Sequence, residues 1–440
     1  MMKEIIQYKL AQAMAESPPE LTLRDARLPQ VPNKAHAIIG MRRSGKTTFL
    51  QQCRNDRLAA GKPRDSLVYF SFDDERLADM DAEHLGLILE EYYLLKPEYR
   101  DTATVTFFLD EIQLIQGWEQ FARRIMDSEK IELFVSGSSA HMLSREVATS
   151  FRGRAMETRI YPFSFREFLR HRGSEPEKDI RLLTKAERSM LESAFQEYLV
   201  QGGFPEAQGV PEIDRLMLLQ SYVDTVILRD IIERHDIRNV VALREMIRQQ
   251  LASAASSFSV HKCYNDLKSR GIAASKDLLH ALLAHIEDSF LIRLVPIHTD
   301  SERQRQINPR KIYPIDQGMI PAFDRSGKTN LGHALETAVL IELERRRCER
   351  AYLHTAERYE VDFLATPIVG EPLLIQVCAD VSAPKTRKRE LRALEAAINE
   401  NPGCRAFLLT QSSTGLDIIR REASSNIQVM SAWEWMLSNE

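Results

Sequence analysis

The chain has 440 residues, of which 44% are hydrophobic and 28% are charged, and its formal net charge is −4. A chain of this length holds about three domains with ordinary apolar cores. The small negative charge excludes a chain that is basic throughout, so any nucleic-acid surface has to be a local patch. The five cysteines are scattered without a C-x-x-C pair, which argues against a disulfide framework or a zinc site and favours a reducing compartment.

The first 16 residues mix charged and apolar side chains at helical spacing. They lack the uninterrupted apolar segment of a signal peptide. The chain also has no apolar stretch of about 18 residues, the length that a membrane-spanning helix needs. These features predict a cytoplasmic protein without a membrane partner. A proline-rich stretch then leads to Asn33, and we expect it to lie across the edge of the first sheet.

The segment Gly40–Thr47 has the spacing G-x-x-x-x-G-K-[ST] of a phosphate-binding P-loop. A short apolar strand is predicted before it, and a helix over residues 46–55 begins within it. Glycines let successive backbone N–H groups point at phosphate oxygens, and the N-terminus of the helix attracts an anion. Lys46 is expected to contact the β- and γ-phosphates, and the Thr47 hydroxyl to bind Mg²⁺. The predicted ATP-binding residues are Gly40, Arg42, Arg43, Ser44, Gly45, Lys46, Thr47 and Thr48.

An apolar strand over residues 105–109 ends in two acids, Asp110 and Glu111, which is a Walker B pattern. Asp110 is expected to hold Mg²⁺, directly or through water. Glu111 is expected to polarise the water that attacks the γ-phosphate. Such a strand is common by itself, and its position after a P-loop makes it specific.

The next predicted strand, over residues 131–135, ends at a serine-rich turn. Ser138 and Ser139 are candidates to sense the γ-phosphate or to orient the attacking water. A helix N-cap is an equally good interpretation, because serine favours both roles.

Two arginines in the turn over residues 151–154 precede a fifth predicted strand at residues 156–160. Arg152 or Arg154 is a candidate to stabilise charge on the transferring phosphoryl group, in cis or from a neighbouring subunit. A solvated or structural arginine is the alternative for each of them. The predicted catalytic residues are therefore Lys46, Glu111, Ser138, Arg152 and Arg154.

Taken as a set, several segments resemble the AAA+-type predicted ATPases of the archaeal-ATPase neighbourhood. The resemblance covers most of the chain and implies a parallel five-stranded α/β core with the P-loop strand central and the Walker B strand nearby. It also implies a following helical region and a domain of unknown function, but no substrate. The segments are the P-loop with its Arg-Arg pair, FLDEIQ (108–113), SGSSA (136–140), FRGR (151–154), YPFSFREFL (161–169), YLVQGGFPE (198–206) and YVDTVILRDI (222–231).

We predict three domains: a P-loop ATPase domain over residues 1–165, a helical and winged-helix region over 166–325, and a C-terminal domain over 326–440. Helical periodicity dominates residues 164–235. The segment Gly202–Pro205 interrupts it, either as a simple turn or as a nucleotide-contacting loop.

Residues 260–269 and 276–288 are predicted helices, and residues 290–295 and 311–315 are predicted strands. Two helices followed by a hairpin form the winged-helix layout. The second helix is weakly charged, so DNA binding and a structural or protein-binding use are about equally supported. The joining loop is a candidate phosphate-binding wing because it contains Arg303, Arg305, Arg310 and Lys311.

The last third begins with a predicted helix over residues 331–347, followed by extended segments at 352–363 and 373–378. A basic helix at 386–399, further strands at 405–409 and 427–430, and a closing helix complete it. This order resembles the PD-(D/E)XK, restriction-endonuclease-like fold. In that fold an acid on the first helix, an aspartate and an acid-x-Lys motif hold Mg²⁺ and activate water.

Position by position, Glu336 matches the helix acid and Asp362 matches the metal-binding aspartate. Gln376 stands where the second acid belongs, and Cys378 stands where the lysine belongs. Glutamine is neutral and a poor Mg²⁺ ligand, and cysteine supplies no ammonium. The resemblance is therefore to a degenerate nuclease, and we expect the domain not to cleave DNA.

Only a lysine from another element would restore the missing charge, and Lys385 or Lys388 on the basic helix are the candidates. Cys378 is expected to be a small buried thiol instead of a nucleophile. The basic helix is either a DNA-backbone surface or a solvated face, through Arg387, Lys388, Arg389 and Arg392.

These features predict a Mg²⁺-dependent ATPase whose hydrolysis changes the conformation of a DNA-associated protein, with ATP and Mg²⁺ as cofactors. The alternatives are an ATP-regulated DNA nuclease and a non-hydrolysing, ATP-bound DNA-binding or scaffold protein. The expected partners are DNA, through the winged helix and the basic helix, a protein, and a second copy of the chain if an arginine acts in trans.

Overall fold

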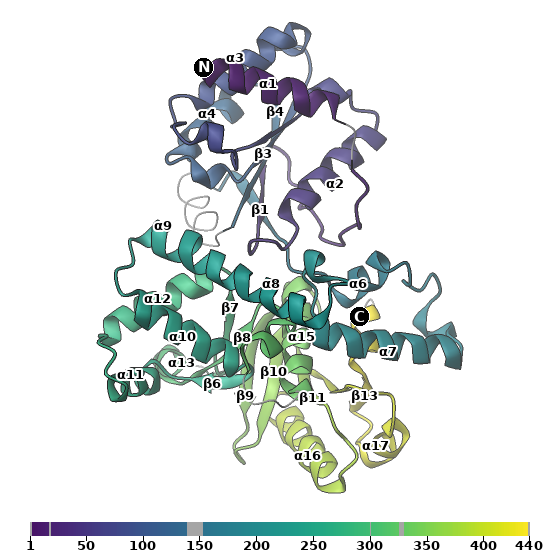
Figure 1. Ribbon diagram of the computed structural model, residues 1–440. Coiled ribbons are helices and arrows are strands. Elements are labelled where there is room, and N and C mark those ends of the chain that lie inside the picture. The colour runs from purple at the N-terminus through teal and green to yellow at the C-terminus, as the bar shows by residue number, and fades with distance from the viewer. Residues whose placement is uncertain (1, 17–18, 139–152, 300, 325–329, 439–440) are drawn as a thin grey trace. The chain divides into compact units, whose positions relative to one another are not determined.

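The computed structural model describes residues 2–16, 19–138, 153–299, 301–324 and 330–438 (Figure 1). The chain divides into two compact units, Met1–Ile160 and Tyr161–Glu440. The division between them lies close to the predicted boundary at residue 165. The predicted boundary at residue 325 falls inside the second unit. In the described part of the chain, every helix is too short or too polar to cross a membrane.

The first unit contains a five-stranded sheet in the order β2-β3-β4-β1-β5, and all four strand pairs are parallel. Strands β1, β2 and β3 are almost continuously apolar, as expected for strands that are covered on both faces, whereas the edge strand β5 is more polar. The expected parallel five-stranded core is confirmed. The expectation of a central P-loop strand is wrong, because β4 is central and separates β1 from the Walker B strand β3. The strands are β1 (Ala35–Ile39), β2 (Leu67–Ser71), β3 (Val105–Asp110), β4 (Ile131–Gly137) and β5 (Ala155–Arg159).

Among the residues of this unit that the structure describes, four longer helices accompany the sheet. The helix after the P-loop extends to Ala59, beyond the predicted end at residue 55. Its buried Phe49 and Leu50 pack into a core with Phe108 and Phe134 of the sheet. The helices are α1 (Met2–Ala15), α2 (Lys46–Ala59), α3 (Leu85–Leu95) and α4 (Trp118–Ser128).

The second unit begins with a helical region, as predicted from its periodicity. Helix α7 starts with a capping box in which Thr184 and Glu187 satisfy each other's backbone N–H groups. The helix that starts at Glu212 continues into a π-helical segment, Val226–Ile232. The helices are α6 (Phe165–His171), α7 (Lys185–Gln201), α8 (Glu212–Thr225), α9 (Glu233–His235) and α10 (Val240–Ala252).

A three-stranded sheet in the order β6-β8-β7 follows, and its neighbours are antiparallel. The predicted helices at 260–269 and 276–288 are found with those bounds. Strand β6 and helix α13 were not predicted, because three and six residues are too short to show a period. The elements are β6 (Ser256–Phe258), α11 (Val260–Ser269), α12 (Lys276–Asp288), β7 (Ile292–Val295), α13 (Glu302–Ile307), β8 (Arg310–Pro314) and α14 (Met319–Phe323).

The last part of the second unit contains a five-stranded mixed sheet in the order β13-β12-β11-β10-β9. Strands β9 to β11 are antiparallel, and β11 to β13 are parallel. The single extended segment predicted at 352–363 is wrong: it holds parts of two strands joined by a tight turn, in which Arg358 has a φ of 65°. The elements are α15 (Leu331–Arg345), β9 (Glu349–His354), β10 (Glu360–Thr366), β11 (Leu373–Cys378), α16 (Pro384–Glu400), β12 (Arg405–Thr410), α17 (Leu416–Glu422), β13 (Ile427–Ser431) and α18 (Ala432–Leu437).

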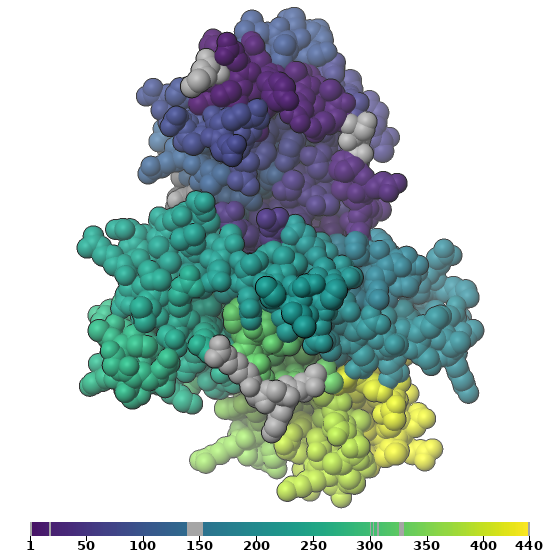
Figure 2. Space-filling view, in the orientation of Figure 1, coloured from purple at the N-terminus to yellow at the C-terminus, as the bar shows by residue number. Residues whose placement is uncertain are grey.

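One hydrophobic core explains why the second unit is not divided at residue 325. Phe195 and Leu199 of α7 belong to the same buried cluster as Leu340 of α15 and Trp433 of α18. In Figure 2 the teal and the yellow-green parts of this unit pack against each other. Elements on both sides of the predicted boundary therefore fold together.

Candidate active site

The P-loop connects the end of β1 to the start of α2, and three of its residues have left-handed backbone conformations. Gly40, Arg43 and Gly45 have φ angles of 155°, 65° and 100°. A Cβ atom at Gly40 would overlap the carbonyl oxygen of Ile160, so only glycine fits there. Arg43 holds a conformation that side chains with a Cβ rarely adopt, a strain that is typical of functional loops.

Lys46 is 5% exposed and its ammonium lies beneath the loop. Its Nζ atom is 3.3 Å from the carbonyl oxygen of Met41 and 3.5 Å from Oε1 of Glu111. Burial alone would raise the pKa of Glu111, but the positive charges of Lys46 and Arg42 and a hydrogen bond from Gln113 lower it below its usual value. Glu111 is therefore an ionised carboxylate at neutral pH.

The Thr47 hydroxyl donates a hydrogen bond to Oδ2 of Asp110 over 2.7 Å. The Tyr69 hydroxyl donates to the same oxygen over 2.8 Å, and Ser136 donates to the other carboxylate oxygen. Burial and the charge of Asp110 raise the pKa of Tyr69, which keeps this phenol a donor. The two predicted Mg²⁺ ligands thus lie together.

Ser136 also accepts the backbone N–H of Glu111 over 2.9 Å. It therefore fixes the positions of both acids at the end of β3. Neither Tyr69 nor Ser136 was predicted as a site residue. The signal that would have found them is the strand order, since β2 and β4 are the two neighbours of β3 in the sheet.

The other predicted site residues of this unit are placed as follows. Ser138 is fully buried directly after β4. Ser139 and Arg152 lie outside the described residues. Thr48 is half-buried in the first turn of α2, whereas Arg43 is exposed.

Arg154 is not brought to the P-loop. Its carbonyl oxygen accepts the N–H of Ala35 at the start of β1, and its guanidinium forms an ion pair with Asp127. The P-loop follows the other end of β1, and a five-residue strand is roughly 17 Å long. Within one chain, Arg154 therefore lies near the start of β1, and the nucleotide loop lies at the other end of this strand.

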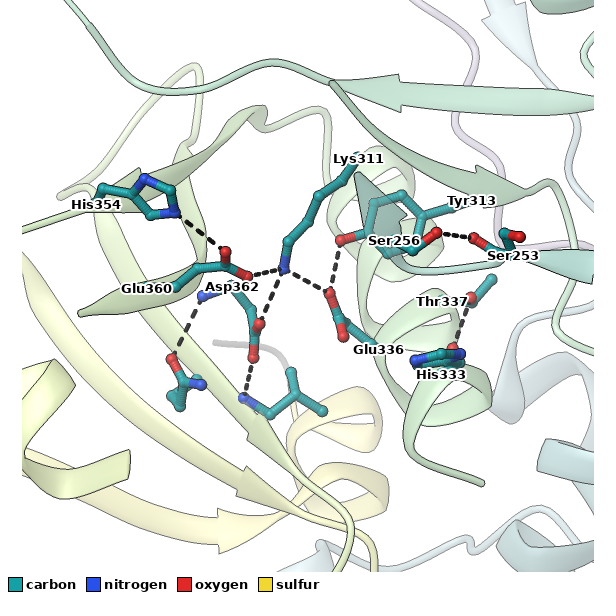
Figure 3. A network of polar contacts seen from close by, with 12 residues as sticks. Ser253, Ser256, Lys311, Tyr313, His333, Glu336, Thr337, His354, Glu360 and Asp362 are labelled. Carbon is teal, nitrogen blue, oxygen red and sulfur yellow. Dashed lines mark hydrogen bonds and ion pairs between the residues drawn. The ribbon is translucent and has the colours of Figure 1, made fainter. Parts of the chain in front are cut away.

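A second polar cluster lies in the C-terminal part of the chain (Figure 3). The Nζ atom of Lys311 is 3.1 Å from Glu336, 2.7 Å from Glu360 and 3.2 Å from Asp362. The Tyr313 hydroxyl donates to Glu336 over 2.6 Å. Burial would lower the pKa of Lys311, but the three carboxylates raise it well above its usual value. One permanent ammonium therefore sits among the carboxylates.

Two acids of this cluster have raised pKa values, mainly because they are buried. Burial, followed by the charge of Asp362, raises the pKa of Glu336, and burial also raises the pKa of Asp362. Oδ2 of Asp362 accepts the N–H of Val377 over 2.9 Å. In the described part of the chain, no group of three or more His, Cys, Asp or Glu side chains is arranged to hold a metal ion.

This geometry corrects two predictions. Lys311 is 4% exposed as a residue of β8, so it does not belong to an exposed, phosphate-binding wing. Lys385 and Lys388 are exposed on α16, so the lysine near the acids comes from β8 and from neither of them. The sequence prediction missed this lysine because β8 reaches the acids through a tertiary contact, which no local sequence pattern indicates.

Gln376 and Cys378 of β11, which stand where the acid and the lysine of the nuclease pattern were expected, both make local contacts. Gln376 donates from Nε2 to Oε2 of Glu390 over 2.8 Å. The thiol of Cys378 donates to the carbonyl oxygen of Asp380 over 3.3 Å, and burial raises the pKa of Cys378 to about 12. Cys378 is thus a buried thiol, as expected.

Two further sequence features have structural roles. Arg387 is buried and donates to both carboxylate oxygens of Glu422 over 3.0 Å, so it is not part of an exposed basic face. The N–H of Gly203 donates to Oδ2 of Asp316 over 2.7 Å, and the N–H of Gly318 donates to Oδ1 over 2.9 Å. The turn at Gly202–Pro205 is thereby fixed inside the second unit.

Comparisons with known proteins support the interpretation of the first unit as an ATPase domain. Residues 32–169 match the family model of an AAA domain, and residues 192–330 match a domain of unknown function (DUF8612). The chain is 33% identical over 423 residues to the uncharacterized protein MJ1544 of Methanocaldococcus jannaschii, covering 94% of this chain and 91% of that protein. The chain belongs to the same family as MJ1544.

Other similar proteins are more distant. An uncharacterized protein of Haemophilus influenzae is 26% identical over 346 residues, covering 78% of this chain and 82% of that protein. The Walker-type ATPase PABY2304 of Pyrococcus abyssi is 14% identical with a TM-score of 0.42, over 73% of this chain and 95% of that one. The AAA domain makes the first unit a P-loop ATPase domain and supports nucleotide binding and hydrolysis.

Proposed function

We propose that this protein binds ATP together with Mg²⁺ and hydrolyses it at the P-loop. The observation that carries the proposal is the 2.7 Å hydrogen bond between the Thr47 hydroxyl and Asp110, next to the ion pair of Lys46 with Glu111. A hydroxyl and a carboxylate are hard oxygen ligands that suit Mg²⁺, and phosphate and water oxygens complete its coordination. The donor set at this position therefore fits the metal.

The residues divide the work by charge. Lys46 is the cation that meets the β- and γ-phosphates, and it exchanges its contact with Glu111 for phosphate oxygens. Glu111 is then free to accept a proton from the attacking water, as an ionised carboxylate can. Bound Mg²⁺ supplies charge neutralisation on the phosphates. Ser138, close after β4, is the proposed γ-phosphate sensor.

An arginine finger from a neighbouring subunit completes this proposal. Arg154 lies far from the P-loop of its own chain, so a role in phosphoryl transfer requires a second copy. Arg152 is the other candidate. The measurement is ATPase activity per chain against protein concentration: a rise with assembly supports an action in trans, and a constant value argues against it.

Substitution of Lys46 tests the proposal itself. We expect Lys46→Ala to abolish ATP turnover in Mg²⁺ buffer, while Lys62→Ala, at an exposed position after α2, leaves it unchanged. Phosphate release is measured with and without EDTA. Turnover that survives both Lys46→Ala and removal of Mg²⁺ would sink the proposal. Tight ATP binding without phosphate release, alone or with DNA, would favour a non-hydrolysing scaffold.

We further propose that hydrolysis repositions a winged helix and a nuclease-like domain that does not cleave. The chain order α10-β6-α11-α12-β7-α13-β8 and the sheet order β6-β8-β7 support the winged helix. A helix followed by a mixed sheet of strands β9 to β13 supports the nuclease-like frame. The ammonium of Lys311 among Glu336, Glu360 and Asp362 supports the absence of cleavage, because it holds the charge position of a divalent cation.

A DNA partner would contact exposed cations of α16. Lys385, Lys388 and Arg392 remain exposed there, unlike Arg387. Fluorescence anisotropy with labelled duplex at several salt concentrations tests this surface. We expect the triple alanine variant to weaken binding and to lower the salt slope by about 3, one for each phosphate that its side chains no longer neutralise. Unchanged binding would favour a protein partner over DNA. The nuclease alternative would be favoured by DNA cleavage in Mg²⁺ or Mn²⁺ that is lost in Asp362→Ala.

A further inference from the structure

Arg24 contacts the P-loop from a segment that precedes the first strand and has no regular secondary structure. It is 5% exposed, and its Nη1 atom donates a hydrogen bond to the carbonyl oxygen of Ser44 over 2.9 Å. Ser44 is itself fully buried in the loop, between Arg43 and Gly45. A buried guanidinium that donates to a backbone carbonyl of the phosphate loop has no counterpart in the sequence motif.

Helix α2 holds Arg24 in this position. The side-chain amide of Gln52 accepts the N–H of Arg24 over 2.7 Å and donates to the carbonyl oxygen of Arg24 over 3.1 Å. Gln52 lies about two turns into α2, the helix that follows the P-loop, so the segment of Arg24 is attached to the helix that begins just after Ser44. Gln52 thus holds the backbone of Arg24, and the guanidinium bonds the loop, all within the first unit.

The contact has a consequence for the next N–H group of the loop. In a trans peptide, the carbonyl oxygen and the amide hydrogen point to opposite sides of the chain. Because Arg24 holds the carbonyl of Ser44 on one side, the N–H of Gly45 points to the other side. Gly45 has a φ of 100° and caps the N-terminus of α2, where backbone N–H groups bind phosphate.

We infer that Arg24 is a positioning residue for nucleotide binding, which fixes the peptide between Ser44 and Gly45 so that the Gly45 N–H faces the phosphates. The inference rests on the proposed function, because it concerns the same nucleotide site. Arg24 acts through the loop and does not contact the nucleotide. Its buried positive charge also adds to the positive potential that favours a polyphosphate.

The test compares Arg24→Ala with Arg27→Ala, an exposed arginine of the same segment. The affinities for fluorescent ATP and ADP analogues and for pyrophosphate, each with Mg²⁺, are measured together with the melting temperature of the nucleotide-free protein. We expect Arg24→Ala to weaken all three ligands about 10- to 100-fold, the range for the loss of one hydrogen bond from a charged group. Arg27→Ala is expected to bind like the wild type.

Chemical rescue separates positioning from general stability. Added guanidinium ion at millimolar concentration is expected to restore nucleotide affinity to Arg24→Ala but not to Lys46→Ala. If Arg24→Ala folds poorly, Gln52→Ala gives the second readout, since it releases the backbone of Arg24 and should weaken binding by a smaller factor. Wild-type affinity in Arg24→Ala, or weak binding without rescue, would overturn the inference. Absence of ATP binding in the wild type would instead overturn the proposed function.

Discussion

The ammonium of Lys311 lies 3.2 Å from a carboxylate oxygen of Asp362, and both side chains are buried although 51 residues separate them. Lys311 belongs to β8 of the three-stranded sheet, whereas Asp362 belongs to β10 of the five-stranded sheet. The contact therefore joins two sheets of the second unit through charge.

Replacement of Lys311 by methionine should destabilise the second unit by about 3–5 kcal/mol. The substitution keeps the volume of the side chain but leaves the buried Asp362, the largely buried Glu336 and the exposed Glu360 without their shared cation. Urea unfolding of the full chain measures this free energy. A Trp118→Phe background limits the fluorescence signal to Trp433 and Trp435 of the second unit.

Two comparisons control this prediction. Lys385→Met, at an exposed position of α16, should change the free energy of unfolding by no more than about 0.5 kcal/mol. Asp362→Asn should cost less in the Lys311→Met background than in the wild type, because the two residues interact directly. A Lys311→Met variant as stable as Lys385→Met would show that the cluster contributes no net stability.

The nucleotide site was largely predictable because its signal is local. Residues Gly40–Thr47 are contiguous, and Asp110 with Glu111 ends a strand whose apolar pattern is plain. What was missed lies on neighbouring strands or in irregular segments. Tyr69, Ser136 and Arg24 reach the site only through the strand order and the path of the N-terminal segment.

In the second unit, the sequence predicted the helices but not the contacts between elements. The helices at residues 260–269 and 276–288 follow directly from amphipathic periodicity. The lysine of the acidic cluster does not, because Lys311 comes from a strand that lies outside the predicted C-terminal domain. A predicted boundary at residue 325 separates Lys311 from the acids, but one hydrophobic core contains residues from both sides of this boundary. Sequence patterns locate elements better than the contacts between them.

Glu111→Gln should separate nucleotide binding from hydrolysis. The amide keeps the size of the side chain, so ATP should still bind with Lys46 and Thr47. It cannot accept a proton from water, so turnover should fall about 10²- to 10⁴-fold. ATP affinity and single-turnover hydrolysis are measured in parallel. Equal turnover in wild type and variant would remove Glu111 from the proposed mechanism.

The stability of the second unit should depend on pH through Asp316. Burial raises the pKa of Asp316 from its ordinary value of 3.8 to about 6, although hydrogen bonds from Gly203 and Gly318 oppose this shift. Between about pH 4 and pH 6 the folded state therefore keeps a proton that the unfolded state releases. Stability from this group is fully present below about pH 4, falls as the pH rises to about 6, and is then constant, with a total change of about 3 kcal/mol.

Asp316→Asn provides the reference for this dependence. The variant has no titrating group at this position and loses one acceptor oxygen, so it should be less stable than the wild type at every pH. The difference between the two proteins should grow by up to about 3 kcal/mol as the pH falls from 7 to 4, because only the wild type takes up the proton. Urea unfolding at several pH values measures it, and a difference that does not change with pH would contradict the assignment.

Gly202 and Gly271 provide a comparison that tests the turn at Gly202–Pro205. Their φ angles are 77° and 74°, so alanine is strained at both positions, and the ψ of −173° at Gly202 lies in a region that is essentially limited to glycine. A Cβ at Gly271 has no heavy atom within 4 Å, whereas a Cβ at Gly202 would overlap the Asp316 carboxylate. Gly202→Ala should therefore cost about 1–3 kcal/mol more than Gly271→Ala in urea unfolding. Equal losses would mean that Asp316 moves away freely, and that the buried carboxylate does not fix the turn.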